Sequence, residues 1–290
     1  MSAILSLKPI TPKPSFCVAK NKLKFQSENC YQNVKNSFYD RLKQITSKIA
    51  EMKIPKIKGI IDRRILINYQ IDKEVLENYL PKPFKPKLVN EKGIAGICLI
   101  RLKEIRLLGL PKQLGISSEN GAHRIAVTWE ENGEIKEGVF IPRRDTSSKL
   151  NSLAGGTIFP GIHHLAKFTV NEYDENYEVS FVSDDKTSLA IKAKETTHWN
   201  TESVFDNLDC VSDFFEKGSI GYSPTKKGFD GLELKAYNWK VSLLEVAEVK
   251  SSFFDDKSIF PENSVKFDNA LLMKNIEHQW ISLKKIKNGE

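Results

Sequence analysis

The sequence has few cysteines and lacks the short motifs that mark the common enzyme classes. Its four cysteines show no CxxC or Cys/His spacing, so neither a zinc site nor a disulfide framework is predicted. It also contains no Walker loop, GxGxxG, HExxH, GxSxG or EF-hand loop. We therefore expect no metal ion and no cofactor. The scattered thiols favour a reducing compartment, which predicts a cytoplasmic location.

The sequence also lacks long apolar runs, and the part after residue 58 lacks a large net charge. No stretch approaches the roughly 18 uninterrupted apolar residues of a membrane helix, so no membrane-spanning segment is expected. Residues 1–58 hold 12 of the 44 Lys and Arg but three of the 37 Asp and Glu, which leaves 32 basic and 34 acidic residues elsewhere. The body is therefore close to neutral, and its charge gives no reason to expect a nucleic-acid partner.

The basic charge belongs to an N-terminal extension, which we predict to be flexible over residues 1–33. Its first acidic residue is Glu28, and it has no long apolar segment of the kind that a secretory signal requires. Targeting to an organelle stays open, because transit peptides are also poor in acidic residues. The mitochondrial type favours Arg, which the first 27 residues lack.

Residues 34–54 are predicted to form an amphipathic helix that ends before Pro55. Phe38, Leu42, Ile45 and Ile49 recur at steps of three and four residues and share one face. Such a helix commonly packs on the domain that follows it. Basic amphipathic helices also dock on anionic membrane surfaces or on partner proteins, so these alternatives stay open, as does oligomerisation.

Residues 55–290 are predicted to form one α+β domain that is mainly antiparallel β. About nine strand-like runs occur with no βαβ rhythm, which favours an antiparallel barrel or sandwich. Asn132–Gly133 marks a hairpin turn, and helices are expected over residues 72–80 and 203–217. The segment 107–114 is apolar but contains Gly and Pro, so it is expected to be a buried loop.

Three segments of the body together resemble the acetoacetate-decarboxylase-like superfamily, in particular a large branch of it without characterised function. They are SENGAHRIAV at residues 118–127, GVFIPRRD at 138–145 and GGTIFPGIHHLA at 155–166. The resemblance covers residues 58–285. It implies a closed, cone-like antiparallel barrel with helices at its rim and an internal cavity of the size of a ligand.

The resemblance also implies which chemistry is lost. Decarboxylases of the superfamily use a lysine that forms a Schiff base, and His163 and His164 stand where the lysine pair would be. An imidazole cannot form an iminium with a ketone carbon, and Lys167 would have to shift in register to serve. We therefore do not expect Schiff-base decarboxylation.

Other residues of the family's pocket are retained. Glu119 matches a glutamate beside the lysine, and Arg124 matches an arginine of the branch. With His163 or His164, Glu119 would make an acid/base pair, because burial moves both pKa values toward neutrality. The alternative is a Glu119–Arg124 ion pair that fixes a strand end. Arg143 and Arg144 are candidates to clamp a carboxylate or phosphate, or are part of a solvated turn.

The sequence therefore predicts a domain that binds a small, anionic organic molecule in an internal cavity. Glu119, His163 and His164 are the candidate catalytic residues, and Arg124, Arg143 and Arg144 are the candidate ligand-binding residues. If the protein is an enzyme, the residues permit a lyase or isomerase step on a carbonyl compound. A non-enzymatic carrier, or a scaffold that docks through the basic helix 34–54, is the alternative.

Overall fold

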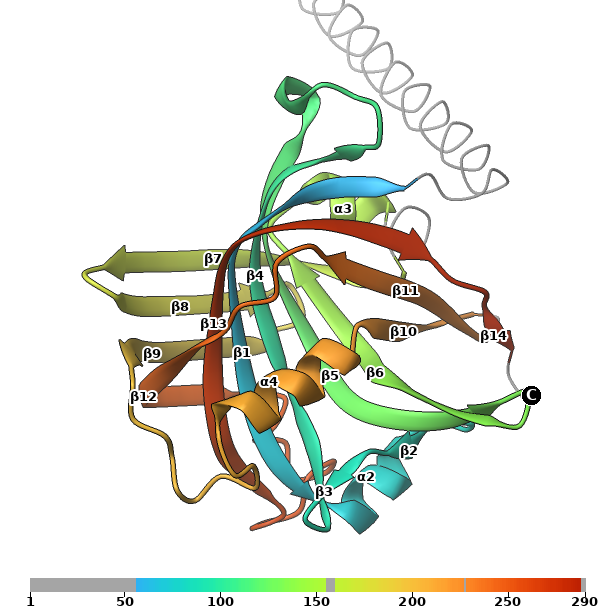
Figure 1. The fold of residues 1–290 in the computed structure, drawn as a ribbon, viewed down its shortest axis with the longest axis vertical. Coiled ribbons are helices and arrows are strands. Elements are labelled where there is room, and N and C mark those ends of the chain that lie inside the picture. The colour runs from blue at the N-terminus through green and yellow to red at the C-terminus, as the bar shows by residue number, and fades with distance from the viewer. Residues whose placement is uncertain (1–55, 155–159, 227, 288–290) are drawn as a thin grey trace, which may run out of the picture. The chain divides into compact units, whose positions relative to one another are not determined.

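The protein is a mainly β structure with a few short helices (Figure 1). This computed structural model describes residues 56–154, 160–226 and 228–287. The predictions for residues 1–33 and 34–54 lie outside the described residues. The helices are α2 (Lys73–Tyr79), α3 (Lys149–Ala154) and α4 (Leu208–Lys217), with a 3₁₀ turn η1 (Lys112–Leu114).

Fourteen strands of the described residues form one sheet. They are β1 (Ile57–Asp72), β2 (Lys85–Pro86), β3 (Leu88–Val89), β4 (Lys92–Leu107), β5 (Ile116–Glu131), β6 (Glu134–Thr146), β7 (His163–Tyr173), β8 (Asn176–Ser183), β9 (Ser188–Thr196), β10 (Ile220–Thr225), β11 (Gly228–Ala236), β12 (Ser242–Ser251), β13 (Val265–Ser282) and β14 (Ile286–Lys287). The predicted fold class, mainly antiparallel β with few helices, is confirmed. Two pairings, β6–β7 and β6–β10, are parallel, so the sheet is mixed.

The sheet closes on itself in two rings that share a wall. The strand order β6–β7–β8–β9–β12–β13–β1–β4–β5, with the pairing β5–β6, closes a ring of nine strands. The order β6–β10–β11–β13–β1–β4–β5 closes a ring of seven strands. The shared wall is β13–β1–β4–β5–β6, and both of its faces are therefore interior faces.

Burial on both faces explains the apolar run at the centre of the wall. In β4, Ile94–Leu99 is buried at every position rather than at alternate positions. Strands that are covered on both sides read as continuous hydrophobic runs, and side chains of successive residues then enter different interiors. Ile97 and Leu99 face one core, whereas Ile94 and Cys98 face the other.

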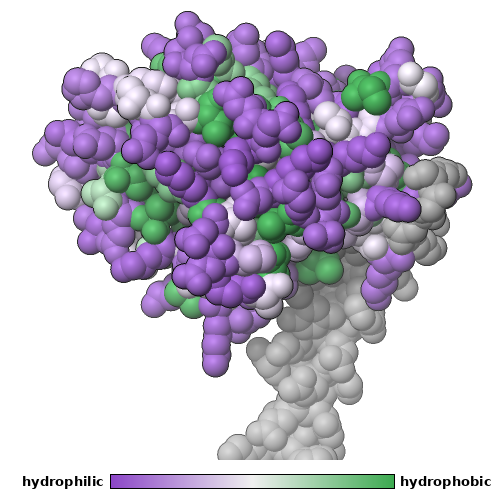
Figure 2. Space-filling model, turned by 90° about the horizontal axis from the view of Figure 1, so that it is seen from below, coloured by the Kyte–Doolittle hydropathy of each residue, from purple (hydrophilic) through white to green (hydrophobic). Residues whose placement is uncertain are grey.

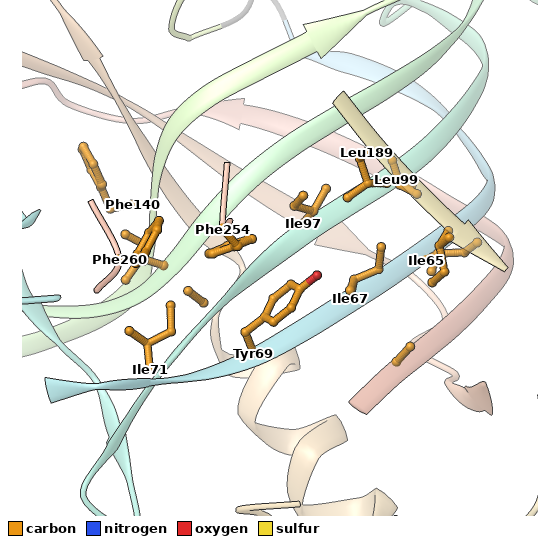
Figure 3. Close-up of a cluster of buried hydrophobic side chains, with 14 of the residues drawn as sticks. Ile65, Ile67, Tyr69, Ile71, Ile97, Leu99, Phe140, Leu189, Phe254 and Phe260 are labelled. Atoms are coloured by element: carbon orange, nitrogen blue, oxygen red, sulfur yellow. The ribbon is translucent and has the colours of Figure 1, made fainter. Parts of the chain in front are cut away.

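The first core fills the nine-strand ring. In β1, Ile65, Ile67, Tyr69 and Ile71 lie on one side of the wall, and Figure 3 shows them together with buried aromatic rings. The ring of Tyr69 lies 4.5 Å from that of Phe254, between centroids, in a tilted arrangement. Aromatic contacts of this kind add to the free energy gained from burying apolar area.

The second core lies on the other side of the wall, beneath α4. Val211 and Phe215 of α4 are buried in it, next to Leu66 and Met273. A helix was predicted over residues 203–217, but α4 begins only at Leu208. Asn207 is its N-cap, since its side chain accepts a hydrogen bond from the backbone N–H of Cys210. Phe205 precedes the helix and is nevertheless buried, so its helical spacing was misleading.

Two local predictions had different outcomes. The Asn132–Gly133 turn joins β5 to β6, and both residues have positive φ, as a tight hairpin requires.

The prediction of a buried loop over residues 107–114 was wrong. Leu108 is 53% exposed and Leu114 is 63% exposed, at the end of the long β4–β5 hairpin, which projects from the body in Figure 1. The polar backbone of a Gly- and Pro-broken segment is more easily hydrated than buried.

The surface seen in Figure 2 is mainly hydrophilic, with small and separate hydrophobic patches. No helix of the described residues is long and apolar enough to cross a membrane.

The parallel contact between β6 and β10 closes the seven-strand ring and depends on Gly138. A Cβ atom at Gly138 would lie 2.4 Å from the carbonyl oxygen of Ile220. We expect Gly138→Ala to lower the free energy of unfolding by about 1–3 kcal/mol, because a backbone strand must move. Urea denaturation measures this. Gly218→Ala is the control, since its Cβ would meet Phe215 O at an ordinary 3.5 Å. Equal stability of both variants would contradict the prediction.

Candidate functional site

A cavity of about 300 Å³ is enclosed by residues of all seven strands of the smaller ring and of α4. Its apolar lining includes Ile100, Ile141, Phe215, Trp239 and Trp280. Its polar lining includes three arginines, two asparagines and a histidine, namely Arg64, Arg124, Arg144, Asn120, Asn151 and His163. An apolar enclosure with a few convergent polar groups is typical of a small-molecule site.

Strand register places several of these side chains side by side. Cys98 of β4 is opposite Ala122 of β5, which is opposite Arg144 of β6, which pairs with His163 of β7. Neighbouring strands lie about 4.8 Å apart, so this row runs about 14 Å from Cys98 to His163. The next row along the wall contains Arg64, Ile100 and Asn120. The site is therefore set by the pairing of four strands.

Arg124 is the most deeply buried cation of the cavity lining. Its side chain is 3% exposed, and one terminal nitrogen donates a hydrogen bond to the side-chain oxygen of Asn68. Its Nε and Nη1 atoms have no hydrogen-bond partner among the described residues. Its guanidinium lies 4.3 Å from the centroid of the Phe215 ring, and burial lowers the pKa of Arg124. Burying a cation whose N–H donors have no acceptor costs free energy, unless a ligand accepts hydrogen bonds from those donors.

Arg64 and Arg144 lie on the same side of the wall and are only half-buried. Arg144 donates from Nε to Ser223 Oγ at 3.2 Å, and burial lowers its pKa to about 10, so it stays charged at neutral pH. Arg64 donates to Cys98 Sγ at 3.5 Å. None of the three arginines has a carboxylate partner within the described part of the chain. The lining also contains exposed Lys235 and three carboxylates: Glu216 is exposed, Glu233 is half-buried, and buried Asp145 pairs with Arg143.

The two adjacent histidines point in different directions, as expected for neighbours on a strand. His163 lines the cavity, whereas Nδ1 of His164 lies 3.6 Å from Asp185 Oδ2 on the other side of β7. Burial, followed by the charge of Arg144, lowers the pKa of His163 to about 3. The imidazole that faces the cavity is therefore neutral at physiological pH. It can both accept and donate a hydrogen bond.

Glu119 does not line this cavity. It bridges two arginines: its carboxylate is 2.6 Å from Arg63 Nη2 and 2.6 Å from Arg101 Nε. Both arginines also pair with Glu172 of β7. Arg124 is not its partner, so the ion pair that the sequence suggested as an alternative is replaced by a network that also includes Asp62. Nothing in the geometry brings Glu119 to His163 or to His164.

Arg143 and Arg144 are also separated by the strand. Arg143 faces away from the cavity, where Nη2 lies 2.7 Å from Asp145 and Nη1 lies 2.5 Å from Asp185. Ser183 donates to the same Asp145 at 2.5 Å. Of the two arginines, only Arg144 lines the cavity, so the structure does not bring the predicted pair together as a clamp.

Arg64, Cys98, Asn120 and Asn151 were not among the candidates from sequence, although all four line the cavity. Arg64 directly precedes the apolar run Ile65–Ile67, and Cys98 lies inside another apolar run, so the local sequence gave each an ordinary structural explanation. Strand alternation could have found Arg64, Cys98 and Asn120, because it puts them on the face of Arg124, whereas Asn151 lies in α3. Among the described residues, no group of three or more His, Cys, Asp or Glu side chains could hold a metal ion.

Comparison with known proteins establishes the fold. No protein-family model and no curated protein matches this sequence. Among solved structures, acetoacetate decarboxylase from Legionella pneumophila superposes with a TM-score of 0.53 at 10% identity, over 81% of this chain and 88% of that one. The chain has the fold of acetoacetate decarboxylase.

A second solved structure is also similar to this chain. The enduracididine biosynthesis enzyme MppR superposes with a TM-score of 0.53 at 7% identity, over 83% of this chain and 92% of that one. The resemblance inferred from residues 118–166 is thus confirmed as a likeness of fold.

The Glu119 network predicts a structural role for this carboxylate. Glu119→Gln removes the charge that bridges Arg63 and Arg101, and Arg63 is 2% exposed. We expect the free energy of unfolding to fall by about 2–4 kcal/mol, since a buried cation loses a partner. Thermal and urea denaturation would measure it. If stability were unchanged and binding or turnover were lost, the result would contradict the structural role and support a catalytic role for Glu119.

His163 should make stability depend on pH. The unfolded imidazole has a pKa near 6.5, whereas burial and Arg144 hold the folded value at about 3. Below pH 6.5 the unfolded chain takes up a proton that the folded chain does not, so folding weakens as the pH falls. His163→Asn removes this term. From pH 7 to pH 5 the free energy of unfolding should decrease in the unaltered protein, and the decrease in His163→Asn should be smaller by about 1–2 kcal/mol. Parallel pH profiles in urea denaturation would refute the assignment.

Proposed function

We propose that the cavity binds a small organic carboxylate, with Arg64, Arg124 and Arg144 as the groups that hold it. The observation that carries this proposal is the buried and incompletely paired Arg124, together with two further arginines on the same lining. Guanidinium groups present paired N–H donors that match a carboxylate. The cavity volume of about 300 Å³ suits a small molecule rather than a polymer.

Proton transfer on a carbonyl compound is the chemistry that this lining permits. His163 is a neutral imidazole in the cavity, in register with Arg144. A carboxylate held by Arg144 would offset the positive charge that helps to lower the pKa of His163, and the imidazole could then take a proton from the bound molecule. The asparagines Asn120 and Asn151 offer further amide groups to a carbonyl oxygen. A lyase or isomerase step by His163 is therefore included in the proposal.

The proposed chemistry does not pass through a Schiff base. Of the described residues that line the cavity, Lys235 is the one lysine, and its side chain is exposed at the rim. Lys167 is exposed on β7 and is not a lining residue. A Schiff-base lysine needs a desolvated amine of lowered pKa, which an exposed side chain does not provide.

The fold supports the same type of ligand. The similar structure of MppR holds the condensation product of pyruvate and imidazole 4-carboxaldehyde. A protein of this architecture can therefore accommodate a small, pyruvate-derived molecule.

Isothermal titration calorimetry with a panel of two- to six-carbon oxo and hydroxy acids tests the proposal. We expect Arg144→Gln to weaken binding of any hit about 10- to 100-fold, because one charge-assisted contact to the carboxylate is lost. Each acid is compared with its neutral amide, which should bind weakly or not at all. Equal binding of acid and amide would refute the carboxylate assignment.

Arg143→Gln is the matched control for this experiment. Arg143 is the neighbour of Arg144 on the same strand, but its partners are Asp145 and Asp185. We expect its removal to lower stability and to leave the affinity for the acid within about twofold. Loss of affinity in Arg143→Gln but not in Arg144→Gln would place the anion on the other side of β6.

A further inference from the structure

Cys98 is a thiol at the buried end of the cavity that anion binding does not explain. It is 4% exposed, yet it is a lining residue, and it is free. Its neighbours on β4, Ile97 and Leu99, face the other core, so strand alternation alone turns the sulfur toward the cavity.

Two cationic groups adjoin this thiol. Arg64 donates to Sγ at 3.5 Å, and Arg124 lies close enough for its charge to act on the sulfur. Burial opposes ionisation of Cys98, but the charges of Arg64 and Arg124 and their hydrogen bonds to the sulfur outweigh it and lower the pKa of the thiol. The thiolate is the nucleophilic form of cysteine, and an adjacent cation is what favours it.

A second observation at the same place indicates a ligand. Arg124 is 97% buried and keeps Nε and Nη1 without a partner among the described residues, while its side chain lines the cavity. A carboxylate that satisfies these donors would lie beside Cys98, because Arg124 is near the sulfur. The ligand's carbon next to its carboxylate would then be within reach of the thiolate.

We propose that Cys98 is a nucleophile whose targets are small carboxylates with an electrophilic carbon. The inference rests on the anion site of the proposed function and adds a covalent step to it. With an α-halo acid, a sulfur lone pair forms the S–C bond, the carbon–halogen bond breaks, and halide leaves with its electron pair. With an α,β-unsaturated acid, S–C and C–H bonds replace the S–H bond and the C=C π bond. Neither step needs an external oxidant or reductant.

Iodoacetate and iodoacetamide are a matched pair of probes for this site. They deliver nearly the same carbon, but only iodoacetate carries a carboxylate, and ordinary thiolates react faster with the neutral reagent. The full-length protein is treated with each reagent, and peptide mass spectrometry gives the rate at each cysteine. Cys210, which is exposed on α4, is the internal reference.

At Cys98 we expect the ratio of the iodoacetate rate to the iodoacetamide rate to exceed that at Cys210 by about 10-fold or more. The iodoacetate rate should also saturate with concentration, because binding precedes reaction. Acids that bind in calorimetry should slow the labelling of Cys98 and not that of Cys210.

Charge variants show whether the arginines direct the reagent. Arg64→Gln should reduce the iodoacetate rate at Cys98 at least about 10-fold and change the iodoacetamide rate less. If Arg64→Gln does not fold, Arg144→Gln gives the same comparison, because Arg144 is only half-buried and does not contact the sulfur in the described structure.

The outcomes separate this inference from the proposed function. If acids bind in calorimetry but Cys98 resists iodoacetate, the anion site stands and the nucleophile is overturned. If Cys98 reacts faster with iodoacetamide and without saturation, the thiol is reactive but not directed to carboxylates, which also overturns the inference. If acids neither bind nor protect and iodoacetate does not saturate, both proposals fail.

Discussion

Burial of the β13–β1–β4–β5–β6 wall on both faces is the constraint on which the rest of this structure depends. Over the middle of that wall, as at Ile94–Leu99 of β4, a strand has no solvent side, so alternate residues enter the nine-strand ring and the seven-strand ring. The first interior is filled by aliphatic and aromatic side chains. The second keeps a cavity because long arginine side chains and α4 line it instead of packing it closed.

The same constraint separates residues that are neighbours in sequence. Arg143 pairs with two aspartates, whereas Arg144 enters the cavity. His163 faces the cavity and His164 faces Asp185. Arg63, Arg101 and Arg143 are paired with carboxylates, whereas the cavity arginines Arg64, Arg124 and Arg144 have no carboxylate partner among the described residues. The difference in pairing, rather than the amount of charge, distinguishes a supporting network from a binding site.

Sequence reasoning could predict the fold class and that His163 and His164 point to opposite faces, because both follow from the period-two alternation of strands. It could not predict which of the two faces the cavity. It could not predict that Leu107–Leu114 extends into solvent, since an apolar composition does not show whether the backbone's polar groups find partners. Glu119 was assigned to the cavity because family resemblance gives a position along a strand. Only the register, which includes bulges near Asp62 and His123, gives the face. Arg64 and Cys98 were missed for a related reason. Both adjoin or lie in apolar runs that are typical of strands, and the local sequence does not show that their side chains face a cavity.

Because the cavity and the opposing core are encoded by alternate residues of the same strands, evolution can alter them by different routes. A substitution at Arg144, Ala122 or Cys98 changes the chemistry of one interior and leaves the packing of the other intact. Insertion or deletion of one residue within β4, β5 or β6 would instead exchange the two sets of side chains. Changes in chain length are therefore expected at the hairpin ends, such as Asn132–Gly133 and the projecting β4–β5 tip. Ligand preference should diverge among homologues by point substitution alone.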